Sequence, residues 1–93
     1  MNSQKQQRKI NIQVPREEMR GVYANLLRVL HSKEEFCLDF ANVFGEQGVL
    51  TARVFVSPGH LKRIVRTLTQ TLQKYEATWG QINESGDQPQ IGF

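Results

Sequence analysis

Hydrophobic and polar residues alternate along much of the chain, which is the pattern of β-strands. Residues 10–14 alternate isoleucine or valine with asparagine or glutamine, and Pro15 ends the run. Residues 36–44 alternate with the same two-residue period, and residues 49–56 are rich in β-branched and aromatic side chains. Since a strand points successive side chains to opposite faces, these runs predict strands at 10–14, 36–44 and 49–56.

Residues 16–31 fit either a helix or a strand. Apolar residues recur at helical spacing from Met19 to Leu30, and the two glutamates after Pro15 suit a first helical turn. Gly21 interrupts that pattern, and the alternating run that follows requires a neighbouring strand. Periodicity alone slightly favours the helix, so the choice depends on how this segment pairs with residues 36–44.

A hairpin between residues 21–31 and 36–44 gives one consistent register. With a four-residue loop, Arg28 faces Asp39, and apolar residues face apolar residues along the rest of the pair. A slip of one residue would place Asp39 against Leu27. We therefore predict a strand over 21–31. The predicted pairs also include His31–Phe36, Leu30–Cys37, Val29–Leu38, Leu27–Phe40, Leu26–Ala41 and Tyr23–Phe44.

A second hairpin follows the first. Residues 45–48 begin and end with glycine, which predicts a four-residue loop between two antiparallel strands. This loop length places Phe44 opposite Val49 and Leu38 opposite Phe55.

A single long helix completes the predicted fold. Ser57 is a typical helix cap, Pro58 suits the first turn, and Gly80 is a typical end. Between them apolar residues recur every three or four positions. We predict a two-layer α+β domain: a four-stranded antiparallel meander with strands at about 10–14, 21–31, 36–44 and 49–56, followed by a helix at 58–79. This domain spans residues 10–82, with polar tails at 1–9 and 83–93.

Both faces of the predicted sheet are apolar. One face carries large residues such as Leu38 and Phe55, which suit the helix, and only Arg28 and Asp39 interrupt the other face. One helix can cover only one face, and a sheet face in water usually carries regular polar residues. We therefore predict a homo-oligomer, a dimer or a tetramer, over the alternative that the N-terminal segment folds back as a lid. The predicted oligomer interface comprises Val22, Leu26, Arg28, Leu30, Asp39, Ala41 and Val54.

Composition narrows the functional classes. The chain has 93 residues and a formal net charge of +3, which permits an anionic partner without requiring one. Cys37 is the only cysteine, so no internal disulfide can form, as is usual in the cytoplasm. No segment has the apolar core of a signal peptide or the roughly 20 apolar residues of a membrane helix. We expect a cytoplasmic protein without a membrane partner.

Charged residues supply two candidate sites. A basic group lies at the start of the predicted helix, where backbone N–H groups attract anions. It is a candidate contact for an anion or a nucleic acid, although a solvated basic face is the favoured explanation. Its members are His60, Lys62, Arg63 and Arg66. The second site is the Arg28–Asp39 pair, which we interpret as a structural ion pair rather than a general base. We predict no catalytic, metal or cofactor site, because His31, His60 and Cys37 lack metal-ligand spacing.

Several short motifs are distributed over most of residues 10–82. They are Gly21-Val22-Tyr23-Ala24-Asn25, His31-Ser32, Glu35-Phe36, Leu38-Asp39-Phe40, Ser57-Pro58 with His60 and Lys62, Lys74-Tyr75-Glu76, and Trp79-Gly80. In this combination they resemble a family of small bacterial and archaeal proteins catalogued as a domain of unknown function. The resemblance implies strand structure at 21–31 and no particular chemistry. The predicted order of elements is also similar to the core of tetrameric export chaperones of the SecB type, in topology only.

These observations favour a non-enzymatic protein over an enzyme. We expect an oligomeric protein-interaction or adaptor module that binds itself and another protein, and a chaperone-like role is one form of this function. The alternative is a nucleic-acid-binding accessory protein that uses the basic residues of the helix.

Overall fold

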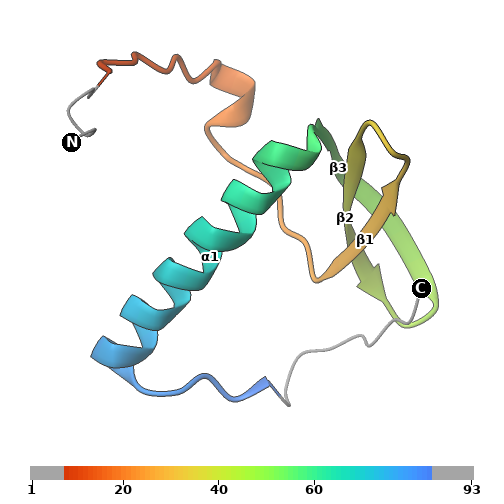
Figure 1. The fold of residues 1–93 in the computed structure, drawn as a ribbon. Helices are drawn as coiled ribbons and strands as arrows, with labels where there is room; N and C mark the ends of the chain where they lie inside the picture. Colours follow the sequence, from red (N-terminus) through yellow and green to blue (C-terminus); the bar gives the residue numbers. More distant parts are fainter. Residues whose placement is uncertain (1–7, 85–93) are drawn as a thin grey trace.

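The computed structural model describes residues 8–84 and shows a three-stranded antiparallel sheet followed by one long helix (Figure 1). The elements are the 3-10 turn η2 (Arg16–Glu18), the strands β1 (Leu26–His31), β2 (Phe36–Phe44) and β3 (Gln47–Val56), and the helix α1 (Pro58–Trp79). The strand order is β1-β2-β3. This is an α+β fold, as predicted.

The predicted fourth strand is not confirmed. Residues 10–14 form no strand, and the predicted strand at 21–31 begins only at Leu26. Gly21 adopts a φ of 70°, a left-handed conformation that a strand does not contain. The predicted tails at 1–9 and 83–93 lie largely outside the described residues.

The register between β1 and β2 is confirmed along the whole of β1, from Leu26 opposite Ala41 to His31 opposite Phe36. Asn25 extends this pairing beyond the strand. Its backbone N–H donates to the Ala41 carbonyl at 3.0 Å, and its side-chain amide both donates to and accepts from the backbone of Val43, at 3.1 and 2.9 Å. The amide thus takes the place of the next backbone pair, while Tyr23, predicted to face Phe44, lies outside the strand.

The predicted register between β2 and β3 is wrong. Phe44 pairs with Gln47, so Gly45 and Glu46 form a two-residue turn, and Gly45 has the positive φ of 61° that such turns require. Farther along, an irregularity leaves Thr51 as an extra residue, whose hydroxyl donates to the Phe40 carbonyl at 3.0 Å. One extra residue moves every later side chain to the opposite face of the sheet.

The register therefore defines two faces that differ from the prediction. The Asp39 face consists of Leu26, Arg28, Leu30, Cys37, Asp39, Ala41, Val43, Leu50, Arg53 and Phe55. The Leu38 face consists of Leu27, Val29, His31, Phe36, Leu38, Phe40, Asn42, Phe44, Val49, Ala52, Val54 and Val56. Beyond the bulge, Phe55 lies on the face predicted for Val54, and Val54 lies on the face predicted for Phe55.

The helix has the predicted limits. The Ser57 hydroxyl caps its start by accepting from the His60 backbone N–H at 3.2 Å, and the Gly80 N–H donates to the Glu76 carbonyl at its end. Its apolar residues form one continuous stripe, which we name the α1 stripe. The α1 stripe consists of Leu61, Ile64, Val65, Leu68, Leu72, Tyr75 and Trp79.

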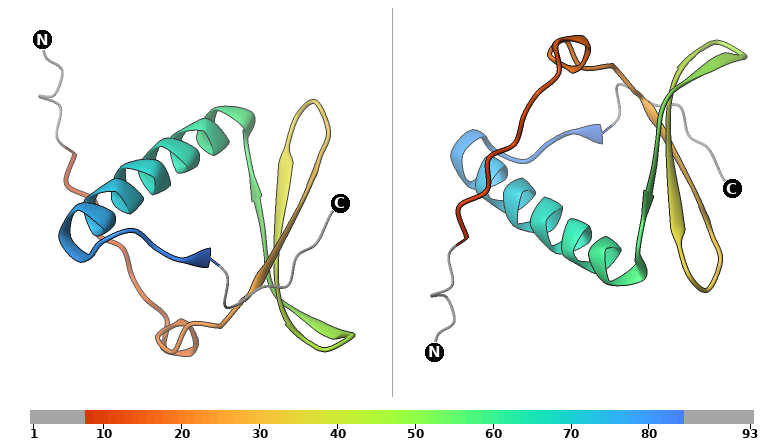
Figure 2. Two further views of the ribbon diagram at one scale, coloured as in Figure 1. Left: turned by 90° about the horizontal axis from the view of Figure 1, so that it is seen from below. Right: turned by 90° about the horizontal axis from the view of Figure 1, so that it is seen from above.

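The predicted two-layer packing is absent from the described chain. The helix leaves the end of β3 and diverges from the sheet, so that it covers neither face (Figures 1 and 2). No residue of α1 is buried, and extensive packing between elements is confined to the three strands. Leu68 is 62% exposed and Trp79 is 73% exposed.

The chain consequently has almost no interior. Among the described residues only Cys37, Leu38 and Asp39 are buried. The large apolar side chains of the described strands and helix stay exposed, for example Phe44 by 72% and Leu72 by 47%.

Replacing the helix cap tests the junction between β3 and α1. Ser57→Ala removes the acceptor for the His60 N–H and should lower the free energy of unfolding by about 1 kcal/mol. Ser57→Asp, which retains an acceptor, should stay close to wild type. Urea unfolding followed by circular dichroism at one fixed protein concentration measures both variants. Equal stability of Ser57→Ala and wild type would contradict the capping role.

Candidate functional site: an Arg–Asp–Arg ladder on an apolar sheet face

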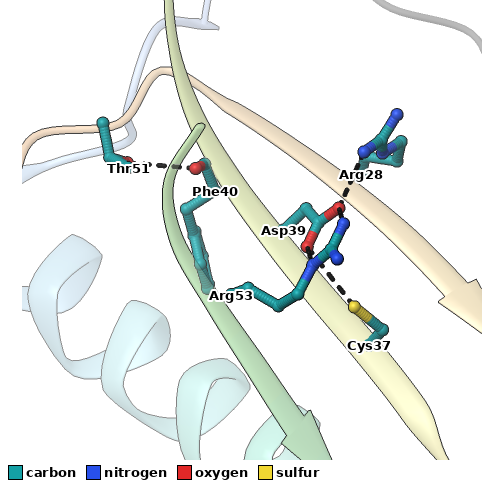
Figure 3. A network of polar contacts seen from close by, with 6 residues as sticks. All are labelled: Arg28, Cys37, Asp39, Phe40, Thr51 and Arg53. Carbon is teal, nitrogen blue, oxygen red and sulfur yellow. Dashed lines mark hydrogen bonds and ion pairs between the residues drawn. The ribbon is translucent and has the colours of Figure 1, made fainter. Parts of the chain in front are cut away.

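The most distinctive polar group of the structure is a ladder of three charges across the sheet. Asp39 lies on the central strand β2, opposite Arg28 of β1 and opposite Arg53 of β3. The antiparallel pairing places all three side chains on the same face (Figure 3). Asp39 is only 1% exposed, which makes it the most buried charged residue among those described.

Four hydrogen bonds satisfy the Asp39 carboxylate. Arg53 donates from Nε to Oδ1 at 2.6 Å and from Nη2 to Oδ2 at 2.8 Å, in the two-pronged geometry that suits a guanidinium and a carboxylate. Arg28 donates from Nη2 to Oδ2 at 2.8 Å. The Cys37 thiol donates to Oδ1 at 3.3 Å. Both oxygens therefore have two donors each.

These contacts set the protonation of the group. Hydrogen bonds from Arg53 and then Arg28 hold the pKa of Asp39 well below its usual range and outweigh the opposing effect of burial. The Asp39 carboxylate in turn raises the pKa of Arg53. Burial, and then the hydrogen bond to Asp39, raises the pKa of the Cys37 thiol. A carboxylate with a lowered pKa is a poor general base, and a thiol with a raised pKa is a poor nucleophile, so the geometry supports the structural interpretation of the pair.

The ladder places three charges on an otherwise apolar surface. The Arg28 and Arg53 side chains, 39% and 44% exposed, both contact the Asp39 carboxylate. Two shallow hollows of about 200 and 210 Å³ lie along this face. One is lined by Leu26, Arg28, Asp39, Ala41, Gly48 and Leu50, and the other by Leu30, His31, Ser32, Glu35, Cys37 and Phe55.

The predicted interface residues do not all lie together. Leu26, Arg28, Leu30, Asp39 and Ala41 share the Asp39 face, whereas Val54 lies on the Leu38 face and Val22 precedes β1. Arg53 is absent from the predicted site, because the predicted register placed it opposite Phe40. The sequence does contain a signal for this contact. Arg53 is the single arginine of an apolar strand, and Asp39 is the only acidic residue within 36–56 apart from Glu46 of the turn, so Asp39 is the available partner for Arg53.

The predicted basic group lies in the first turns of α1. Helical spacing places Lys62, Arg63 and Arg66 on the side away from the α1 stripe, and all three are exposed. His60 lines a shallow hollow of about 260 Å³ with Arg63, Ile64, Thr67 and Leu68.

Within residues 8–84 no three or more His, Cys, Asp or Glu residues form a group that could hold a metal ion. Of the helices in that range, none combines the length and apolarity needed to cross a membrane.

Comparison with known proteins places the chain in a family. The family model described as "Protein of unknown function (DUF3467)" matches residues 1–84, which include both the ladder and α1. The chain belongs to this family. This confirms the resemblance to a domain of unknown function. No curated protein and no solved structure matches the chain significantly.

Removing the central charge tests the ladder. Asp39→Asn keeps the size of the side chain but removes the negative charge to which both arginines donate, so the melting temperature should fall by more than about 5 °C. Glu46→Gln makes the same chemical change in the exposed turn and should shift it by less than about 2 °C. Scanning calorimetry compares both with wild type. Similar shifts for the two variants would show that the ladder does not hold the sheet together.

The lowered pKa of Asp39 also predicts a pH dependence. An unfolded aspartate has a pKa of about 3.9, so the ladder contributes fully above that pH and its contribution is lost as the pH falls below about 4. The difference in melting temperature between wild type and Asp39→Asn should therefore be constant from about pH 7 to 5 and should narrow at lower pH. A difference that stays constant down to about pH 3 would mean that the pKa of Asp39 is not lowered.

Proposed function

We propose that the protein is a homo-oligomeric, non-enzymatic interaction module that assembles with copies of itself and presents a surface to another protein. The observation that carries this proposal is the simultaneous exposure of the α1 stripe and of the apolar sheet on one small chain. A dimer or a tetramer would remove this surface from water.

The energetic argument rests on the size of the exposed surface. Each Å² of apolar surface buried contributes about 25 cal/mol to the free energy of folding. In a chain of this length, the conformational entropy of folding offsets nearly all of that contribution, so apolar surface left in water is costly. Monomers rarely expose contiguous apolar patches beyond a few hundred Å². Self-association is a usual remedy for small domains with a deficient core.

The Asp39 face supports the second part of the proposal. Its apolar residues surround the partly exposed Arg53 side chain, so its complement is an apolar segment of another protein that carries a hydrogen-bond acceptor for a guanidinium group. Pairing this face with itself would bury the charged ladders of both copies, which disfavours the predicted self-association through it. Adaptor and chaperone-like roles both use such a surface.

Nucleic-acid binding is a second proposal with narrower support. Lys62, Arg63 and Arg66 form an exposed basic side on α1, as contacts to a phosphate backbone would require. No aromatic residue of Pro58–Trp79 accompanies these three on that side, because Tyr75 and Trp79 belong to the α1 stripe. The protein-interaction proposal accounts for more of the exposed surface.

A charge placed in the α1 stripe tests assembly. Leu68 is 62% exposed in the single chain, so Leu68→Asp should be nearly neutral in a monomer but should disrupt an interface. We expect Leu68→Asp to lower the molecular mass measured by light scattering to that of one chain, or to unfold the protein. Gln70→Asp adds the same charge to the opposite side of the same helix turn and should retain the wild-type mass. A wild-type protein that is itself monomeric at high concentration would refute the proposal.

A further inference from the structure

We propose that two copies exchange helices, so that the α1 stripe of each copy packs on the Leu38 face of the other. This inference rests on the proposed self-association and specifies its geometry. Four observations carry it: the junction before α1, the chemistry of the two sheet faces, an unpaired polar atom, and the exposure of both apolar surfaces.

The junction directs the helix away from its own sheet. Ser57 alone separates β3 from α1, with φ −74° and ψ 159°. A residue before proline is restricted to this extended region, proline fixes its own φ, and the Ser57 cap binds the first turn. These constraints act on one short link, so the direction of α1 follows from the direction of β3 (Figure 2). The Leu38 face is thus left for a helix from outside the chain.

The chemistry of the two faces selects the Leu38 face. Its centre is formed by aliphatic and aromatic residues without a charge, which matches the α1 stripe. The Asp39 face instead presents the charged ladder, and covering its partly exposed arginine side chains with an apolar stripe would be unfavourable.

An unpaired acceptor lies on the Leu38 face. The Asn42 Oδ1 atom is buried and has no hydrogen-bond partner among the described residues. Buried polar atoms in folded proteins normally have a partner. The α1 stripe carries two donors, the Tyr75 hydroxyl and the Trp79 indole N–H, which aromatic residues commonly use at interfaces. A helix from a second copy would bring these donors to the same face.

The exposed apolar surface suits a reciprocal dimer. In a two-fold dimer each contact occurs twice, so one helix-on-sheet contact per chain forms two equivalent interfaces. Both surfaces are largely exposed in the single chain, the α1 stripe at Leu68 (62%) and the Leu38 face at Phe44 (72%) and Val54 (43%). Two equivalent contacts would remove both surfaces of each chain from water.

Cross-linking between two different variants tests the exchange. Both chains carry Cys37→Ser, which keeps a hydroxyl donor for Asp39. One chain then carries Leu68→Cys in the α1 stripe, and the other carries Val54→Cys on the Leu38 face together with an affinity tag. The chains are mixed in urea, refolded together and treated with a short bismaleimide. We expect the product that joins the two different chains to predominate.

Phe55→Cys is the matched control for the sheet position. It lies next to Val54, is comparably exposed at 58% against 43%, and faces the opposite side of the sheet. Its product with the Leu68→Cys chain should be severalfold weaker. Equal yields from Val54→Cys and Phe55→Cys would overturn the choice of face. A dominant product between two Leu68→Cys chains, or an internal cross-link in a chain carrying both Leu68→Cys and Val54→Cys, would overturn helix exchange.

A measurement on the unmodified protein removes the dependence on these variants. In a refolded mixture of isotope-labelled and unlabelled wild-type chains, intermolecular NMR contacts should join the Leu68 and Val54 methyl groups. Intermolecular contacts confined to helix–helix or sheet–sheet pairs would overturn the exchange while leaving self-association intact. A wild-type protein of single-chain mass would instead refute the proposed function itself.

Discussion

Burial of apolar surface is the constraint on which the rest of this structure depends. Ordering a chain costs conformational entropy at every residue, and hydrophobic burial is the main term that offsets it. Within residues 8–84 only three side chains are buried, and one of these is the charged Asp39. The hairpins and the helix are well formed locally, but each keeps its apolar side in water. The proposed contact with further chains would bury these apolar sides and would serve both stability and function.

The Arg–Asp–Arg ladder has a different role from the apolar surfaces. Buried ion pairs often contribute little net stability, because desolvation of the charges offsets their attraction. Their geometry is nevertheless demanding. Arg28, Asp39 and Arg53 meet only when all three strands are in one register, so a slip in either hairpin would leave a charge without its partner. The ladder thus specifies the alignment of the sheet and also places charged side chains on one of its faces.

Local signals in the sequence predict much of this fold. The Arg28–Asp39 match and the four-residue loop predict the β1–β2 register, and Ser57, Pro58 and Gly80 predict both ends of α1. The β2–β3 register depends on one extra residue, Thr51, and nothing in the local composition predicts a bulge there. That residue reverses the faces of Val54 and Phe55. Arg53 was missed for the same reason. The packing of the helix was also mispredicted, since an apolar stripe indicates that a partner surface exists but not which chain supplies it.

The dependence of thermal stability on protein concentration tests the central claim most directly. If folding is completed by association, then by mass action the melting temperature of the wild-type protein must rise as its concentration rises. We expect a clear upward shift in calorimetry between micromolar and millimolar samples. A cooperative transition whose melting temperature is the same at every concentration, together with a single-chain mass, would show that the chain is complete by itself and would contradict this account.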